Sequence, residues 1–395
     1  MVIILGIAKY DGPFESTSYT VAKYLAKDND VYYVDYPYTW KDWLTKKDNA
    51  YLKRKPLFSS KSDGILPTNI ERLKIIIVPP LLSINFLKES AFYRYLLSIN
   101  EKIIACRIEK AIGKQSIKKA VYINSFNFHY PNLRKLLSPA LSIYHCVDPL
   151  ILWHDRKHGV ISEKLLVKES DLVICTSRQL FEEKRRLNPA TYFIPNAADL
   201  SHSSKAMDPS LVIHNKLRSI PKPIVGYFGN IERRIDYKLL SDVIKANTEM
   251  SFVFAGPVQE SYVPEEFYTL QNVHFIGRIP YEDMPAVIKG FDVAIIPFKK
   301  DEVSNTIFPL KLFEYLGAGK PVVATDFNLD LKEFTMDEVQ YCSSADDFSA
   351  AIGWSMDNDT EESRQRRIAI AAENSWDKRL SQFKLLIEQS FNENE

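Results

Sequence analysis

The stretch NTIFPLKLFEYLGAGKPVVATD, residues 305–326, constrains the fold of this chain more than any other stretch. Its apolar residues recur at helical spacing behind a helix-compatible proline, and they are Phe308, Leu312, Phe313 and Leu316. Two glycines, Gly317 and Gly319, end that helix before an all-apolar strand at 321–324. A loop, a short helix and a buried strand in this order indicate a parallel α/β sheet.

The start of this expected helix suits a phosphate group. A helix N-terminus offers unpaired N–H groups and a partial positive charge, here at Leu310 and Lys311 directly after Pro309, and Lys311 adds a full charge. Glu314 lies one turn further on the same face, where a carboxylate can accept hydrogen bonds from a ribose diol. The alternative is that Lys311 and Glu314 form a solvated ion pair.

The residues Pro309, Lys311, Glu314 and Tyr315 form the pattern P-x-K-x-x-E-Y, and G-x-P-V-V follows at 319–323. Together they resemble the nucleotide-sugar motif of bacterial glycosyltransferases with the GT-B fold, and the resemblance covers most of residues 222–326. The resembled enzymes are family 4-like proteins of polysaccharide biosynthesis, including teichuronic-acid and xanthan glucuronosyltransferases. The resemblance implies an α/β fold with two Rossmann-like, doubly wound parallel-sheet domains facing a cleft. It also implies a C-terminal helix that crosses back to the N-terminal domain.

Short apolar strands alternate with helices along the rest of the chain, which is typical of such a fold. We expect an acceptor-binding N-terminal domain at 1–205, a nucleotide-sugar domain at 206–372 and a terminal helix at 373–395, with 198–221 as a polar linker. No GxGxxG follows the first strand at 2–7, so a dinucleotide fingerprint is lacking.

The second domain begins with a strand at 223–228 that ends in Gly229 and Asn230. A glycine here lets the backbone approach a diphosphate closely. Arg234 aligns best with the phosphate-binding basic residue of the resembled family. The alternative is that an arginine here only forms an ion pair with Glu232 or Asp236.

Two further stretches complete the expected donor site. After the strand at 273–276, the resemblance implies that backbone groups bond the base edge while Arg278 and Ile279 help form its stacking wall. Retaining members of family 4 carry two glutamates separated by seven residues, and the first of these positions is Thr306 here. Because a hydroxyl cannot supply the same charge to an oxocarbenium ion, we expect inversion, with Asn305 and Thr306 hydrogen-bonding sugar hydroxyls.

A candidate catalytic base lies in the first domain. The stretch LSIYHCVD, residues 141–148, is an apolar strand that ends in Asp148. The carboxyl ends of parallel strands face the ligand crevice, and the resemblance implies that an acid at this place serves as general base. Asp148 can instead cap the following helix, and His145 and His129 are nearby alternatives.

The loop after the first strand is another candidate wall of the acceptor side and contributes Tyr10. Glu15 precedes the next helix, where it is either a catalytic acid or base or an ordinary N-terminal acid. His154 and His158 have a metal-compatible spacing, but no third ligand is evident. The resemblance also implies that no metal or other cofactor is required.

Composition and charge bound the remaining possibilities. Cysteines 106, 146, 175 and 342 have no CxxC spacing and are expected to be reduced, mostly buried thiols of a cytosolic protein. No leader peptide and no apolar run near ~20 residues is visible, so we expect a soluble or at most peripheral protein. The neutral total charge and the absence of a nucleic-acid motif give no support to a nucleic-acid partner.

Charge is nevertheless uneven along the chain. Residues 1–205 contain 31 Lys and Arg against 20 Asp and Glu, whereas the remainder contains 20 against 30. The segment 40–61 combines aromatic residues with cations, a composition that suits a membrane interface but also an ordinary surface excursion. These residues are Trp40, Trp43, Tyr51 and Phe58, with Lys46, Lys47, Lys53, Arg54, Lys55 and Lys61.

The sequence therefore predicts a glycosyltransferase of surface polysaccharide biosynthesis. It would move a sugar from a nucleotide-sugar, UDP-linked on family grounds and with glucuronate as one candidate sugar, to a glycan or lipid-linked acceptor. A nucleotide-sugar 2-epimerase and a non-catalytic nucleotide-sugar-binding protein are the alternatives, and the second predicts that replacing Asp148 changes nothing measurable.

Overall fold

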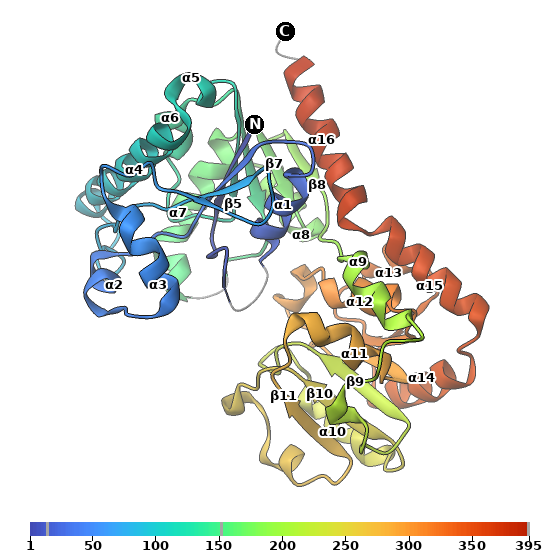
Figure 1. Cartoon of the computed structure of the whole chain (residues 1–395). Coiled ribbons are helices and arrows are strands. Elements are labelled where there is room, and N and C mark those ends of the chain that lie inside the picture. The colour runs from blue at the N-terminus through green and yellow to red at the C-terminus, as the bar shows by residue number, and fades with distance from the viewer. Residues whose placement is uncertain (13–15, 151–152, 393–395) are drawn as a thin grey trace. The chain divides into compact units, whose positions relative to one another are not determined.

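The computed structural model describes residues 1–12, 16–150 and 153–392 of the chain. Its internal contacts divide the chain into two compact units, and each unit is built on its own sheet (Figure 1). Unit 1 comprises Met1–Pro195 together with Leu380–Glu395, and unit 2 comprises Asn196–Arg379. Residues 198–221, expected as a linker, instead contain three short helices in unit 2: α9 Leu200–Ser203, η2 Ser204–Met207 and η3 Asn215–Leu217.

Unit 1 is organised on an eight-stranded sheet with the order β3-β4-β2-β1-β5-β6-β7-β8. Neighbouring strands are parallel, except that β3 runs antiparallel to β4. Apolar, β-branched residues fill the central strands, because a sheet covered on both faces buries every side chain. The strands are β1 Val2–Gly6, β2 Val31–Val34, β3 Ile65–Pro67, β4 Leu73–Ile76, β5 Val121–Ser125, β6 Leu141–Cys146, β7 Leu172–Cys175 and β8 Thr191–Phe193.

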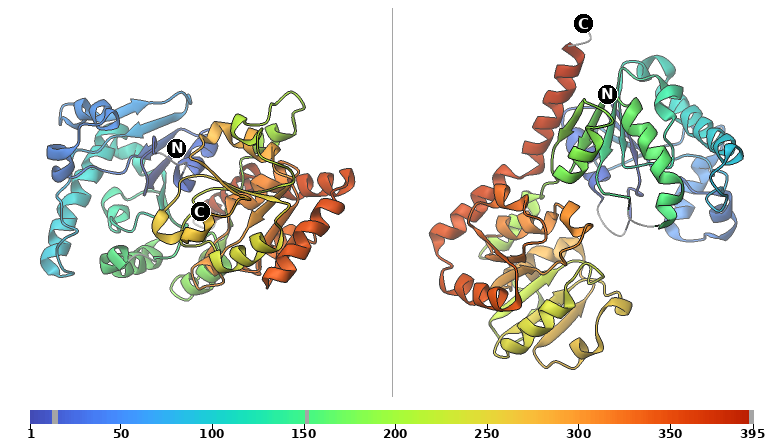
Figure 2. Two further views of the ribbon diagram at one scale, coloured as in Figure 1. Left: turned by 90° about the horizontal axis from the view of Figure 1, so that it is seen from below. Right: turned by 180° about the vertical axis from the view of Figure 1, so that it is seen from behind.

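The helices of unit 1 cover both faces of its sheet (Figure 2). Small polar residues begin several of them: Ser16 accepts a hydrogen bond from the N–H of Tyr19, and Ser90 accepts one from Tyr93. The helices are α1 Thr17–Leu25, α2 Trp40–Thr45, α3 Asn49–Arg54, η1 Lys55–Phe58, α4 Ala91–Ile112, α5 Lys114–Ile117, α6 Leu133–Leu137, α7 Trp153–Glu169 and α8 Arg178–Lys184.

Unit 2 holds a six-stranded parallel sheet with the order β11-β10-β9-β12-β13-β14. Its strands are β9 Ile224–Phe228, β10 Ser251–Ala255, β11 Val273–Gly277, β12 Val293–Ile296, β13 Val322–Thr325 and β14 Val339–Cys342. The order reverses direction beside β9, so the loops after β9 and β12 lie at the topological switch point where α/β sheets bind ligands.

The helices that connect and cover this second sheet include the one expected from the motif at 305–326. That helix, α12, spans Leu310–Gly317. The others are η4 Glu260–Tyr262, η5 Glu265–Tyr268, η6 Tyr281–Asp283, η7 Ser304–Thr306, α10 Tyr237–Ala246, α11 Met284–Lys289, α13 Leu331–Thr335, α14 Ala345–Asp357 and α15 Glu361–Glu373.

The last helix, α16 Trp376–Asn392, contributes its residues from Leu380 onward to unit 1. The ring of Phe383 meets the ring of His145 edge-on at 5.7 Å between centroids, and the ammonium of Lys384 pairs with Asp28. The terminal helix therefore crosses back to the first domain. Within the part of the chain that is described, no helix combines the length and the apolarity that crossing a bilayer requires.

Candidate functional site

Helix α12 is fastened to the carboxyl end of β9 by Tyr315. The fully buried hydroxyl of Tyr315 accepts a hydrogen bond from the N–H of Phe228 at 2.7 Å and donates one to the carbonyl of Phe228 at 3.3 Å. Pro309 occupies the N-cap position of α12 without a side-chain hydrogen bond to the helix. The N-terminus of α12 therefore keeps backbone donors for a ligand, beside the switch point of the sheet.

Lys311, in the first turn of α12, is held by aromatic groups. Its Nζ donates a hydrogen bond to the hydroxyl of Tyr227 at 2.6 Å and lies 3.9 Å from the centroid of that ring and 5.2 Å from the ring of Phe298. Among the described residues, no carboxylate lies within ion-pair distance of this ammonium. Burial first, and then the nearby Arg234, lower the pKa of Lys311 to about 7. The site thus contains a poorly solvated cation that an anionic ligand would stabilise.

Tyr227 was not predicted as a site residue from the sequence. Its hydroxyl accepts from Lys311 and donates to the carbonyl of Asn230 at 2.9 Å, so it links β9, the following loop and α12. The available signal was a residue with a polar tip, next to last in the otherwise apolar strand IVGYF.

Gly229 brings its backbone close to this lysine, and Gly256 packs against Gly229. Gly229 has φ +144° and Gly256 has φ +150°, a region that favours glycine. A Cβ added to Gly229 would lie 2.5 Å from Nζ of Lys311, and one added to Gly256 would lie 2.0 Å from the carbonyl oxygen of Gly229. The absence of side chains therefore leaves the backbone after β9 open beside the cation.

Arg234 lies in the loop between β9 and α10, two residues before Asp236, which caps that helix. Its Nε donates to Glu232, and its guanidinium lies 5.5 Å from the ring of Phe298, which also borders Lys311. The pairing with Glu232 anticipated from sequence is therefore present, and it leaves Arg234 close enough to lower the pKa of Lys311.

Glu314 is 9% exposed and lies one turn after Lys311 in α12. Its Oε1 accepts a hydrogen bond from the hydroxyl of Tyr281 at 3.1 Å. Tyr281 in turn stacks on His202 at 4.4 Å, and Nε2 of His202 lies 2.7 Å from the carbonyl oxygen of Tyr281. Neither residue was predicted from the sequence, because nothing in the local pattern around either one marks a contact 33 or 79 positions away along the chain.

The remaining donor-side candidates differ in accessibility. Arg278 and Asn305 are exposed, whereas Ile279 and Thr306 are buried. The hydroxyl of Thr306 donates to the carbonyl of Val303 at 2.7 Å. Only its acceptor lone pairs therefore remain for a sugar hydroxyl.

The candidate residues of unit 1 lie within the strands of its sheet or shortly after them. Asp148 is exposed two residues beyond the end of β6. His145, inside β6, is only 3% exposed, and its Nδ1 lies 3.1 Å from the hydroxyl of Ser125. Burial lowers the pKa of His145 to about 4, so it is neutral at pH 7 and fits a structural role better than contact with an acceptor. His129 is half-buried among aromatic rings, 4.5 Å from Phe128.

A buried charge cluster at the ends of β1 and β2 was not anticipated. Arg54, expected in an exposed basic segment, has a fully buried side chain that pairs with Asp35 at 2.6 Å and with Asp11 at 2.5 Å. The aspartate directly after the apolar strand VYYV was the available signal, because a buried carboxylate requires a partner. Tyr10 belongs to this cluster: its N–H donates to Asp35 at 2.9 Å, and the Arg54 guanidinium lies 4.7 Å from its ring. Glu15 lies outside the described residues.

The contacts of His158 give no support to a metal site at this residue. Its Nδ1 lies 2.7 Å from a carboxylate oxygen of Glu89, its Nε2 lies 3.1 Å from the carbonyl of Leu87, and its ring stacks on Tyr93. The side chain of His154 lies outside the described residues. Among the side chains that are described, no group of three or more His, Cys, Asp and Glu is arranged to hold a metal ion.

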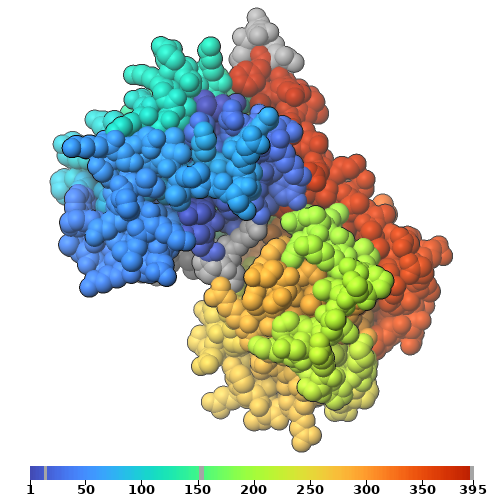
Figure 3. Space-filling model, in the orientation of Figure 1, coloured from blue at the N-terminus to red at the C-terminus, as the bar shows by residue number. Residues whose placement is uncertain are grey.

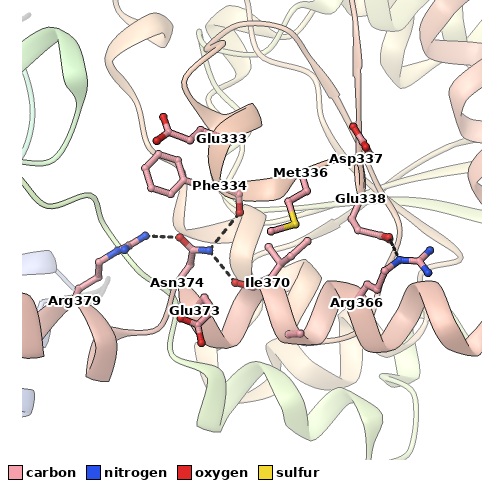
Figure 4. Close-up of a pocket in the computed structure, with 11 residues that line it drawn as sticks. Glu333, Phe334, Met336, Asp337, Glu338, Arg366, Ile370, Glu373, Asn374 and Arg379 are labelled. Atoms are coloured by element: carbon pink, nitrogen blue, oxygen red, sulfur yellow. Dashed lines mark hydrogen bonds and ion pairs between the residues drawn. The ribbon is translucent and has the colours of Figure 1, made fainter.

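Unit 2 also contains a separate pocket of about 730 Å³ lined by α13, the segment before β14, and α15 (Figure 4). Asn374 donates to the carbonyls of Phe334 and Ile370 and accepts from Arg379, while Arg366 pairs with Glu338. None of the predicted donor residues lines this pocket, which is therefore distinct from the surroundings of Lys311.

Residues 222–358, which include the loop after β9 and all of α12, match the family described as glycosyl transferases group 1. The chain is 27% identical over 216 residues to the protein named teichuronic acid biosynthesis glycosyltransferase TuaH of Bacillus subtilis. That match covers 50% of this chain and 53% of the relative, so the chain matches about half of the relative's length.

Solved structures match the whole length. HepE of Anabaena in complex with UDP superposes with a TM-score of 0.66 at 14% identity, covering 98% of this chain and 100% of that one. The α,α-trehalose 6-phosphate synthase of Burkholderia multivorans gives a TM-score of 0.69 at 8% identity, covering 100% and 99%. The chain has the GT-B fold. These structural matches confirm the fold class expected from the sequence.

Proposed function

We propose that this GT-B protein is a glycosyltransferase that takes its sugar from a UDP-sugar bound to unit 2. The observation that carries the proposal is the cation of Lys311, which is partly buried, lacks a carboxylate partner among the described residues and lies beside the N-terminus of α12. A diphosphate supplies the missing negative charge and accepts hydrogen bonds from a helix N-terminus.

The other donor contacts follow from the same arrangement. Gly229 and Asn230 leave room for the diphosphate, and Arg234 adds a second positive charge. Glu314 accepts hydrogen bonds from the ribose diol, and Tyr281 holds its carboxylate in place. The proposal that the donor carries uracil is supported by HepE, which was solved in complex with UDP.

The transfer itself is proposed to invert the anomeric carbon. The acceptor hydroxyl gives its proton to the Asp148 carboxylate as its oxygen bonds to that carbon. The bond from the carbon to the phosphate oxygen breaks, and UDP leaves with the electron pair. Lys311, Arg234 and the N-terminus of α12 stabilise the charge that develops on the leaving diphosphate, so the reaction is proposed to need no metal.

The acceptor is proposed to be a glycan or a lipid-linked glycan of surface polysaccharide biosynthesis. The relative TuaH, named for teichuronic acid biosynthesis, supports this substrate class, and a glucuronosyl donor is compatible with the cations of the site. We further propose a cytoplasmic protein that contacts an anionic membrane peripherally.

The donor site is tested by a thermal-shift panel of nucleotides and nucleotide-sugars on the full chain and on the double variant Lys311→Ala/Glu314→Ala. Binding to the folded chain raises its apparent stability, by about 2.7 kcal/mol at a ligand concentration 100 times Kd. We expect one UDP-sugar to stabilise the wild type and not the double variant. That sugar then enters acceptor assays.

Lys320 offers a matched control. It is also a partly buried lysine of unit 2 whose pKa is lowered by burial, to about 8, but its Nζ donates to the carbonyls of Lys289 and Phe291. Lys320→Ala should retain the response to the UDP-sugar. No stabilisation of the wild type by any nucleotide would contradict the donor site. Stabilisation followed by epimerisation of the sugar without an acceptor would favour the 2-epimerase alternative.

A further inference from the structure

Helix α2 of unit 1 turns its apolar side chains to the solvent. Trp40, Trp43 and Leu44 have the spacing i, i+3 and i+4, which places them on one helix face, and they are 48%, 43% and 71% exposed. The two indole rings pack edge-on at 5.2 Å, so this face presents one continuous apolar group. None of the residues of α2 is buried, which is unusual for a helix with this composition.

The apolar exposure continues on a neighbouring segment. The N–H of Trp40 donates to the carbonyl of Leu81 at 2.9 Å, and the N–H of Lys41 donates to Ser83, so α2 is joined to the loop between β4 and α4. That loop exposes Phe86 by 76%, and the first turns of α4 expose Phe92 and Tyr95 by 61% and 63%. We call these six residues the α2 surface: Trp40, Trp43, Leu44, Phe86, Phe92 and Tyr95.

Positive charge surrounds the α2 surface and is not neutralised by its neighbours. Residues 40–61 contain six lysines and two aspartates. Both aspartates are engaged in capping, since Asp42 accepts from the N–H of Thr39 and Asp48 from that of Tyr51. Lys46 and Lys47 are exposed and have no ion-pair partner in the described part of the chain. Figure 3 shows α2 and α3, in blue, on the outer surface of unit 1.

We propose that the α2 surface docks on an anionic lipid bilayer. A surface that combines tryptophan, phenylalanine and leucine with lysine is typical of a membrane interface. The apolar groups enter the headgroup boundary, and the ammonium groups contact lipid phosphates. The charge favours this occupant over a second copy of the chain, whose identical lysines would repel. The inference deepens the proposed function by naming the surface that would bring the enzyme to a lipid-linked acceptor.

The test is co-sedimentation of the full chain with vesicles of phosphatidylglycerol mixed with phosphatidylcholine, and with vesicles of phosphatidylcholine alone. We expect binding to the anionic vesicles that weakens as salt is raised, and a blue shift of tryptophan emission on binding. Lys46→Glu/Lys47→Glu should weaken the partition coefficient about tenfold or more, since each basic residue contributes to attraction. Trp43→Ser/Leu44→Ser should weaken it by a similar factor through lost apolar burial.

Matched controls separate the surface from general effects. Lys118→Glu/Lys119→Glu makes the same charge change at exposed positions before β5, and Trp354→Ser/Leu329→Ser removes an equally exposed pair from unit 2. Both controls should bind vesicles like the wild type. Absent vesicle binding, equal weakening in the control variants, or a self-association that Trp43→Ser/Leu44→Ser abolishes would each overturn the proposal. The UDP thermal shift is measured on the same samples, so failure of docking is distinguished from failure of the donor site.

Discussion

Lys311→Met should make the chain without ligand more stable and its UDP binding weaker. Folding lowers the pKa of Lys311 from 10.5 to about 7, chiefly because the ammonium is buried. A shift of one pKa unit corresponds to ~1.4 kcal/mol, so burial of the Lys311 ammonium destabilises the folded chain by at most about 5 kcal/mol. Because Lys311 keeps some exposure to water, we expect solvent screening to reduce this cost to about half, ~2 kcal/mol. Lys311→Met should therefore raise the Tm of the chain without ligand by about 4 to 8 °C.

The pH dependence gives the sign of the effect. Below pH 7 the amine is protonated in both the folded and the unfolded wild type, so the folded chain carries the full cost. Between about pH 7 and 10.5 the unfolded chain holds more protons, and the free energy of unfolding therefore rises with pH. Methionine removes this rise. Thermal and urea unfolding of both proteins from pH 6 to pH 10 measures the difference.

Binding changes in the opposite direction. Loss of a hydrogen bond to a charged group costs about 1.5–3 kcal/mol, so UDP should bind Lys311→Met about 10- to 150-fold more weakly by titration calorimetry. Lys320→Met should lose the same kind of pH-dependent cost without weakening UDP. The reasoning is refuted if Lys311→Met binds UDP like the wild type, or if its stability rises with pH as steeply as that of the wild type.

Three further predictions concern other residues. Asp148→Asn should lower turnover by about 10²–10⁴ while leaving UDP affinity unchanged, since a general base acts only in the chemical step; unchanged turnover would remove Asp148 from the mechanism. Tyr281→Phe should weaken UDP by about 0.5–1.5 kcal/mol but leave a 2′,3′-dideoxy analogue unaffected, because only the diol uses Glu314; equal losses for both ligands would contradict this role. Arg54→Met should cost about 3–5 kcal/mol of stability at pH 7 by leaving Asp35 buried and unpaired, and the deficit in urea unfolding should shrink toward pH 5 as that carboxyl takes a proton; a pH-independent deficit would point to lost packing instead.

The strands could be predicted from the sequence because their signal is local. An apolar run such as 2–7 or 321–324 is buried when it forms a strand between two layers of helices, and it coincides with β1 or β13 within one residue at each end. The motif at 305–326 likewise predicted α12, because Pro309 and the glycines mark its two ends.

The contacts around the candidate site could not be predicted, because they join residues far apart in the chain. Tyr227 meets Lys311 across 84 positions, and Tyr315 bonds Phe228 across 87. Arg54 shows the same limit, since a cation in a basic segment is expected in solvent unless the carboxylate that binds it is known. Periodicity reports which face of an element is buried but not which polar tips meet inside the fold.

The buried pairing of Arg54 has a consequence for the size of an acceptor. Arg54 ends α3, and its guanidinium joins that helix to the end of β2 through Asp35 and to the loop after β1 through Asp11. The segment that carries α2 is therefore rigidly held against the carboxyl edge of the sheet. With the α2 surface resting on lipid, that edge lies at one fixed height above the bilayer. The spacer between lipid and sugar, and not the sugar alone, then decides which acceptor hydroxyl is reached.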